Sequence, residues 1–187
     1  LQLGLNSAKT LDDVTASLAL TLVVDHSGSM GGSKMTDVKA GLHVLADKLP
    51  KGTRLAIVKF ESTVTTIFAP QVVGPGEVAK VHAAINGIEP SGGTNLHGGL
   101  AKGLQHCKEA PAGEYEVRRI LFLSDGRASA GNTSETAIVA LATEAAQAGC
   151  SVSTVGVGGD FDLPLMTKMA QVGNGTAWFV QNADHAK

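Results

Sequence analysis

The stretch "LALTLVVDHSGSMGG", residues 18–32, joins a strand-like segment to a polar turn. Its first part, Leu18–Val24, is an unbroken apolar run, which is typical of a strand buried on both faces of a sheet. The run stops at Asp25, and Ser27 and Ser29 follow at alternate positions. The glycines between and after the serines allow the backbone to turn tightly. The stretch therefore predicts a core strand whose carboxyl end presents one carboxylate and two hydroxyls.

Strand-like and helix-like segments alternate along the rest of the chain. Apolar runs predict strands at residues 18–24, 54–60, 63–68, 118–124, 151–157 and 176–180. Apolar residues at steps of three and four predict helices within 35–49, 78–88, 96–104, 138–148 and 165–169. Only two residues separate the segment 63–68 from the preceding predicted strand, 54–60. This gap is too short for a helical crossover, so we expect 63–68 to be an antiparallel edge strand. The alternation predicts a doubly wound α/β fold, in which a mostly parallel sheet carries helices on both faces.

Length and composition fit one folded domain. The chain has 187 residues, 43% of them hydrophobic and 17% charged, which excludes a disordered chain. We interpret residues 1–17 as an N-terminal extension or flanking segment and residues 18–187 as the domain. The final "ADHAK" resembles the start of a helix. Because the first residue is Leu1 rather than Met, we expect the chain to be part of a larger protein.

The charge and hydropathy patterns argue against two classes of partner. The net charge is −2 and the only adjacent basic pair is Arg118–Arg119, so nothing would neutralise a row of phosphates. We therefore expect no nucleic-acid partner. No apolar run approaches the ~20 residues of a membrane span, and no signal peptide is visible. We expect no membrane insertion by this segment.

The two cysteines, Cys107 and Cys150, lie far apart and have no CxxC spacing. We interpret them as two small buried residues rather than a disulfide. Unpaired cysteines favour a reducing compartment, and so a cytoplasmic location over an extracellular or periplasmic one. Beyond that indication the sequence leaves the compartment unknown.

Polar side chains also follow other predicted strands. Ligands of open α/β sheets bind beyond the carboxyl ends of the strands. The cluster Ser124-Asp125-Gly126 stands at the end of the strand 118–124. Thr94 follows the glycine-rich loop, and we expect it to cap a helix that opens at Asn95. If the strands 18–24 and 118–124 are neighbours, five oxygen-bearing side chains converge: Asp25, Ser27, Ser29, Thr94 and Asp125.

The chemistry of this set points to a metal. Two carboxylates and three hydroxyls are hard oxygen donors, which select Mg²⁺, Mn²⁺ or Ca²⁺ over zinc. Neutral hydroxyl ligands leave most of the charge of the metal uncancelled, so a vacant coordination position would attract an Asp or Glu carboxylate of a partner. The histidines show no spacing typical of a zinc site. We interpret His26, inside the first motif, as a solvent-facing spacer.

The motifs "DHSGS" (25–29), "SGGTN" (91–95) and "LFLSDG" (121–126) resemble the metal-ion-dependent adhesion site of the von Willebrand factor type A domain. The family pattern is Asp-x-Ser-x-Ser, a Thr in a glycine-rich loop, and an Asp-Gly after the fourth strand, and all five positions match. The resemblance runs from about Leu18 to the C-terminus. The closing segment "MAQVGNGTAWFV" is similar to bacterial members of the family.

The resemblance implies a Rossmann-like sheet of six strands in the order 3-2-1-4-5-6, with the third strand antiparallel. It implies that Ser27 and Ser29 bind the metal directly and that Thr94 binds it directly or through water. Asp25 and Asp125 would act mostly through water and by holding the serines. A carboxylate from the partner would complete an octahedron. Asn95, which follows the threonine, either orients Thr94 or caps the next helix.

We therefore expect a divalent-metal-dependent protein-binding module, for adhesion or interaction, and not an enzyme. A metal-dependent hydrolase or phosphotransferase is an alternative. No P-loop is present, Ser29 lacks the GxSxG frame, and "GVGGDF" has Phe161 where a dinucleotide fingerprint has glycine. A regulatory module that works beside an ATPase is a third possibility. The sequence identifies neither the partner nor the choice among Mg²⁺, Mn²⁺ and Ca²⁺.

Overall fold

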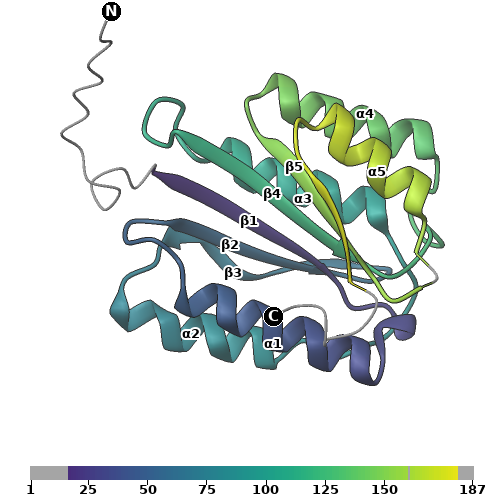
Figure 1. Cartoon of the computed structure of the whole chain (residues 1–187), viewed down its shortest axis with the longest axis horizontal. Coiled ribbons are helices and arrows are strands. Elements are labelled where there is room, and N and C mark those ends of the chain that lie inside the picture. Colours follow the sequence, from purple (N-terminus) through teal and green to yellow (C-terminus); the bar gives the residue numbers. More distant parts are fainter. Residues whose placement is uncertain (1–16, 160, 181–187) are drawn as a thin grey trace, which may run out of the picture.

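A six-stranded sheet forms the centre of the molecule (Figure 1). The computed structural model describes residues 17–159 and 161–180. The strands are β1 (Leu18–Asp25), β2 (Arg54–Phe60), β3 (Val64–Val72), β4 (Val117–Ser124), β5 (Ser151–Val157) and β6 (Ala177–Val180). Their order is β3-β2-β1-β4-β5-β6, and all neighbours pair in parallel except β2 and β3. The predicted strand order and the antiparallel edge strand are both confirmed.

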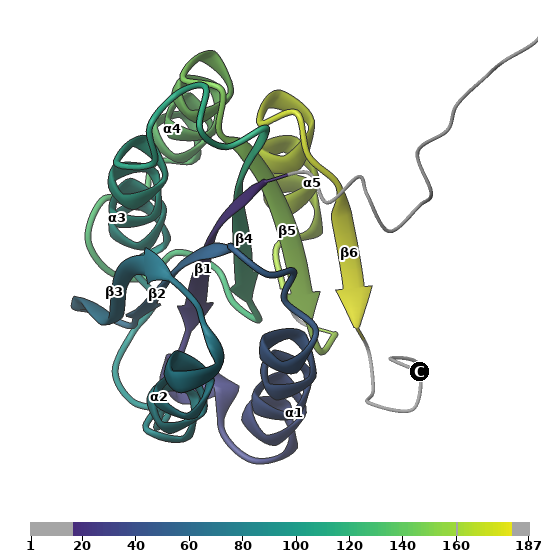
Figure 2. The same cartoon turned by 90° about the vertical axis from the view of Figure 1, so that its left-hand side faces the viewer.

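Helices cover the two faces of this sheet in separate layers (Figures 1 and 2). One layer consists of α1 (Ser33–Asp47) and α2 (Pro75–Asn86), and the other of α3 (Leu96–Lys108), α4 (Glu135–Gln147) and α5 (Leu163–Val172). A short 3₁₀ turn, η2 (Gly28–Met30), links β1 to α1. The helix boundaries agree with the predicted ranges to within a few residues. The structure is therefore the predicted doubly wound α/β fold.

Most of the apolar core lies in two parts, one on each face of the sheet. Leu22 and Val24 of β1 pack in the part beneath α1 and α2, whereas Val23 packs in the part beneath α3 and α4. All three side chains are fully buried. Burial of such a side chain contributes about 1.5–3 kcal/mol. This two-sided packing explains why β1 is a continuous apolar run rather than an alternating one.

Cys107 and Cys150 form a disulfide, so the prediction of two unpaired cysteines was wrong. Cys107 lies in the last turn of α3 and Cys150 directly precedes β5. Their Cα atoms are 6.3 Å apart although 43 residues separate them in the chain. The pairing arises because the fold packs the end of α3 against the start of β5, which no local spacing reveals. The indication of a cytoplasmic location rested on unpaired cysteines and loses its basis.

Two other predictions concern the ends of the chain. The extension predicted for residues 1–17 lies, apart from Ser17, outside the described residues, and so does the helix start predicted at "ADHAK". Within residues 17–159 and 161–180, no helix has both the length and the hydropathy that a membrane crossing requires.

Candidate functional site

The site lies where the carboxyl ends of β1 and β4 meet. These strands pair in parallel up to Val24 and Leu123, so the turns that follow them lie side by side. The turn η2 and the loop before α3 reach the same end of the sheet, because Gly28 N donates a hydrogen bond to Gly92 O at 3.1 Å. We call the side chains gathered there the oxygen cluster, and its members are Asp25, Ser27, Ser29, Thr94 and Asp125.

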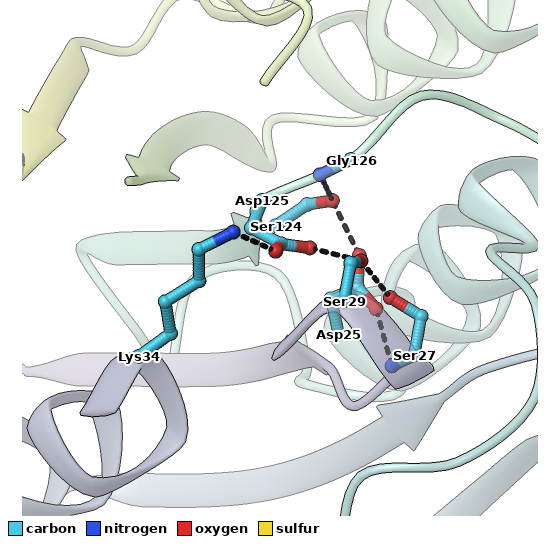
Figure 3. Close-up of polar contacts among 7 residues, drawn as sticks. All are labelled: Asp25, Ser27, Ser29, Lys34, Ser124, Asp125 and Gly126. Carbon is cyan, nitrogen blue, oxygen red and sulfur yellow. Dashed lines mark hydrogen bonds and ion pairs between the residues drawn. The ribbon is translucent and has the colours of Figure 1, made fainter. Parts of the chain in front are cut away.

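Asp25 is the most deeply buried member of the oxygen cluster, with no exposed surface. Its Oδ1 accepts a hydrogen bond from Ser27 N at 2.8 Å, and its Oδ2 accepts one from Ser124 Oγ at 2.5 Å (Figure 3). Burial raises the pKa of the Asp25 carboxyl, the hydrogen bonds from Ser124 and Ser27 lower it in part, and the nearby Asp125 raises it. Both carboxylate oxygens are therefore fixed, and Asp25 holds the backbone of the turn that carries the serines.

The serines connect Asp25 to Asp125. Ser27 Oγ lies 3.1 Å from Ser29 Oγ, and Ser29 Oγ donates a hydrogen bond to Asp125 Oδ1 at 2.8 Å (Figure 3). Ser27 and Asp125 are buried, whereas Ser29 is exposed. The oxygen cluster therefore runs from the core to the surface and opens to solvent at Ser29.

Thr94 lies next to the Asp125-Gly126 turn. A β-carbon added at Gly126 would lie 3.5 Å from Thr94 Oγ1 and 3.8 Å from Ser29 Oγ, so the two hydroxyls flank the same point. Thr94 N donates to Ser129 Oγ at 2.9 Å, and Thr94 O accepts from Ser129 N at 3.0 Å. The loop after β4 thus holds the threonine in place through its backbone.

A positive charge that the sequence analysis missed also lies in the site. Lys34, in the first turn of α1, places Nζ 2.5 Å from Asp125 Oδ2 (Figure 3). Its long side chain reaches from α1 to the turn after β4, so no spacing within a sequence motif predicts the contact with Asp125. The sequence also assigned no role to Ser124, which donates a hydrogen bond to Asp25. Its position next to Asp125 in the same polar cluster could have indicated that it belongs to the site.

Two residues inside the motifs, His26 and Asn95, have structural roles. The prediction that His26 faces solvent was wrong: its side chain is only 6% exposed, and its Nδ1 lies 2.8 Å from Glu89 O. The loop before α3 folds over this histidine, and Ser91 N donates to His26 O at 2.7 Å. Of the two roles considered for Asn95, capping is the one found, because its Oδ1 accepts from Gly98 N at 2.8 Å. The prediction that Thr94 caps this helix was wrong, since α3 begins at Leu96 and Asn95 is its N-cap.

The donor set fits a hard divalent cation. Its side-chain donors are carboxylate and hydroxyl oxygens, the ligands that Mg²⁺ and Ca²⁺ prefer. No group of three His, Cys, Asp or Glu side chains suited to a metal occurs among residues 17–159 and 161–180. Hydroxyls would therefore have to supply most of the protein ligands at the oxygen cluster.

Comparison with known proteins gives a family match. A family model described as the von Willebrand factor type A domain matches residues 18–179. The Synechocystis sp. protein named "Uncharacterized protein sll0103" is 30% identical over an alignment 187 residues long, which covers 99% of this chain and 43% of that protein. Human inter-alpha-trypsin inhibitor heavy chain H6 is 28% identical over 84% of this chain and 13% of its own length. The chain thus spans less than half of each of these relatives.

Solved structures share the fold at low sequence identity. The von Willebrand factor type A protein from Catenulispora acidiphila superposes with a TM-score of 0.81 at 19% identity, covering 90% of this chain and 40% of that one. The vWF domain of the type V pili tip protein Mfa5 from Porphyromonas gingivalis gives a TM-score of 0.73 at 15% identity, covering 92% of both chains. At these identities the likeness concerns the fold alone.

Proposed function

The chain belongs to the von Willebrand factor type A domain family and is a protein-interaction module, and we propose that it binds its partner through a divalent cation, Mg²⁺ first, held at the oxygen cluster. The observation that carries the proposal is the hydrogen-bonded row Ser27–Ser29–Asp125, which lies beside the buried Asp25 and reaches the surface at Ser29. Such a row brings oxygen ligands together before any cation binds.

Each member of the oxygen cluster has a proposed role. Ser27 and Ser29 bind the cation directly through their hydroxyls, and Thr94 binds it directly or through water. Asp25 and Asp125 hold the serines and contribute negative charge, since each accepts a hydrogen bond from the serine turn. The bound cation supplies an electrophile, only partly neutralised, that attracts a carboxylate.

The proposed partner is a protein that offers an Asp or Glu side chain. Exposure of Ser29 leaves the oxygen cluster accessible from outside, which such a side chain requires. We propose bacterial cell adhesion as one setting for this binding; the vWF domain of a pili tip protein has the same fold. We propose a binding function rather than an enzymatic one, because Lys34, the basic side chain found at Asp125, is engaged in an ion pair.

The proposal is tested by calorimetric titration of the chain with MgCl₂. We expect the wild type to bind one Mg²⁺ and Asp25→Ala to lose measurable binding. Asp37→Ala, which removes a carboxylate of α1 outside the oxygen cluster, is the matched control and should bind as the wild type does. Equal binding by the wild type and Asp25→Ala would overturn the proposal.

A second arm addresses the hydrolase alternative. Phosphate esters are incubated with the wild type in the presence and absence of Mg²⁺. We expect no turnover above that of Asp25→Ala. Metal-dependent turnover that Asp25→Asn abolishes would replace the binding module by a hydrolase at the same site.

A further inference from the structure

Two histidines from different helices meet on the layer formed by α1 and α2. His43 of α1 and His82 of α2 stack with ring centroids 4.7 Å apart and ring planes inclined by 25°. Their Nδ1 atoms are 2.5 Å apart, and both side chains are partly exposed. We call these two residues the histidine pair. It belongs to the helices and shares no residue with the oxygen cluster.

The outer ring nitrogens of the histidine pair are both held by oxygen acceptors. His82 Nε2 donates to Asp47 Oδ1 at 2.8 Å, and His43 Nε2 donates to Asn86 Oδ1 at 3.0 Å. Each acceptor lies on the helix of the other histidine: Asp47 is on α1, four residues after His43, and Asn86 is on α2, four residues after His82. Because carboxylate and amide oxygens accept but do not donate, each Nε2 carries the proton of its ring.

If each ring is neutral and carries its proton on Nε2, neither Nδ1 atom of the histidine pair carries a proton. A neutral imidazole has one N–H, so an Nε2–H ring presents a bare lone pair at Nδ1. In the histidine pair, two such lone pairs face each other at 2.5 Å. Their repulsion is relieved when a cation lies between them, and neutral imidazole nitrogen is a preferred ligand of Zn²⁺, Cu²⁺ and Ni²⁺.

We propose that the histidine pair is a binding site for a transition-metal ion such as Zn²⁺, ligated by the Nδ1 atoms of His43 and His82. The contacts of Asp47 and Asn86 support this assignment. In metal sites the second ring nitrogen of a ligating histidine usually donates to a carboxylate or carbonyl oxygen, which fixes the tautomer and the ring orientation. Here both rings have that arrangement.

The number and separation of the ligands indicate a site that is only partly formed by protein side chains. Zn–N bonds are about 2.0 Å long, so two ligands of one tetrahedral ion lie about 3 Å apart, and a small rotation of the partly exposed rings provides that separation. No third His, Cys, Asp or Glu ligand completes the set in the part of the chain that the structure describes. Water or a partner side chain would take the remaining positions, so we expect weaker binding than at a structural zinc site with four protein ligands.

The test is a titration of the intact chain with ZnCl₂ in excess MgCl₂, which occupies the oxygen cluster if that cluster binds Mg²⁺. Calorimetry gives the affinity, and NMR of the imidazole nitrogens identifies the ligands. We expect one Zn²⁺ per chain, with shifts of the Nδ1 signals of His43 and His82 and none at His97. His43→Gln and His82→Gln should each weaken binding at least about tenfold, since each removes one of two ligands.

Two further variants keep the result interpretable. His97→Gln is the matched control and should bind Zn²⁺ as the wild type does. Asp47→Ala changes a side chain that is 62% exposed, so it should leave the fold intact by circular dichroism and still weaken Zn²⁺ binding about tenfold. The proposal is overturned if the wild type binds no Zn²⁺, or if neither histidine substitution changes the affinity. In that case the two Nδ1 atoms share only a proton.

Discussion

The oxygen cluster and the histidine pair are both built from side chains that converge, but on different parts of the fold. The oxygen cluster stands on the ends of two adjacent strands, and its anchor Asp25 has no exposed surface. The histidine pair stands on the outside of two helices, and its anchor Asp47 is 62% exposed. The first offers hard oxygen atoms and the second imidazole nitrogen, so the two should select different ions.

This difference has a consequence for experiment. Substitutions of the buried members of the oxygen cluster act on hydrogen-bonded groups and should change both stability and Mg²⁺ binding. Substitutions in the histidine pair act on partly exposed groups and should change Zn²⁺ binding with little effect on stability. Measuring both ions on every variant therefore separates a local loss of one site from general damage to the fold.

Among substitutions outside the oxygen cluster, the largest effect is expected from Gly92→Ala. Gly92 has a φ of +65°, and an added β-carbon would collide with the Glu61 carboxylate. The backbone strain costs about 1–3 kcal/mol, and the displaced loop carries Thr94, so we expect Mg²⁺ affinity to fall about tenfold. Zn²⁺ binding should not change. Urea unfolding and calorimetry with both ions measure these effects.

The matched control for that variant is Gly76→Ala. Gly76 lies in the first turn of α2, and an added β-carbon there meets nothing within 4 Å. We expect unchanged or slightly higher stability, because alanine restricts the unfolded chain. A Gly92→Ala protein that unfolds and binds Mg²⁺ like the Gly76→Ala protein would show that the loop tolerates the change.

Ser124→Ala should have the next largest effect. It removes the hydroxyl that donates to Asp25 Oδ2 and leaves a buried carboxylate with one partner fewer. We expect a loss of about 1–3 kcal/mol in the free energy of unfolding and weaker Mg²⁺ binding, again with unchanged Zn²⁺ binding. Chemical denaturation measures the first and calorimetry the second. Wild-type stability in this variant would mean that Asp25 does not depend on Ser124.

Lys34→Met should change Mg²⁺ binding in the opposite direction. The ammonium of Lys34 lies 2.5 Å from Asp125 Oδ2 and competes with any cation for that carboxylate. Removing the like charge should strengthen Mg²⁺ binding severalfold, by about 1 kcal/mol in a partly exposed setting. Lys39→Met, on the same helix and paired with Glu89, is the control. Weaker Mg²⁺ binding by Lys34→Met would assign Lys34 a supporting role instead.

The smallest effect is expected at Glu61, beside the loop of Thr94. Hydrogen bonds from the Thr63 hydroxyl, the Thr63 N–H and the Ser62 N–H lower the pKa of Glu61 to about 2 from its usual 4.5. A lowered carboxyl pKa stabilises the fold fully above pH 4.5, and this contribution disappears as the pH falls from about 4.5 to about 2. Thermal unfolding of wild type and Glu61→Gln should therefore differ slightly at pH 7 and converge near pH 2. A constant difference across that range would contradict the assignment.

The fold was predictable because its signals are local. The unbroken apolar run of β1 reflects burial on both faces, and the two-residue gap before β3 excludes a helical crossover. The convergence of the strand-end loops followed from one assumption, that β1 and β4 are neighbours, and the structure bears out that assumption.

The missed features all depend on contacts between distant parts of the chain. The disulfide spans 43 residues, the contact of His26 with Glu89 spans 63, and the ion pair of Lys34 with Asp125 spans 91. The histidine pair spans 39 residues. None of these has a characteristic spacing, because each depends on how two elements pack rather than on the geometry of one turn.

The most direct test of the central claim is an Mg²⁺ titration of the double variant Ser27→Ala/Ser29→Ala. The change removes two hydroxyls and keeps the backbone hydrogen bond from residue 27 to Asp25, so the fold and the histidine pair should survive. We expect a wild-type circular dichroism spectrum and wild-type Zn²⁺ binding, together with a loss of Mg²⁺ affinity greater than about tenfold. Mg²⁺ affinity equal to that of the wild type would contradict it.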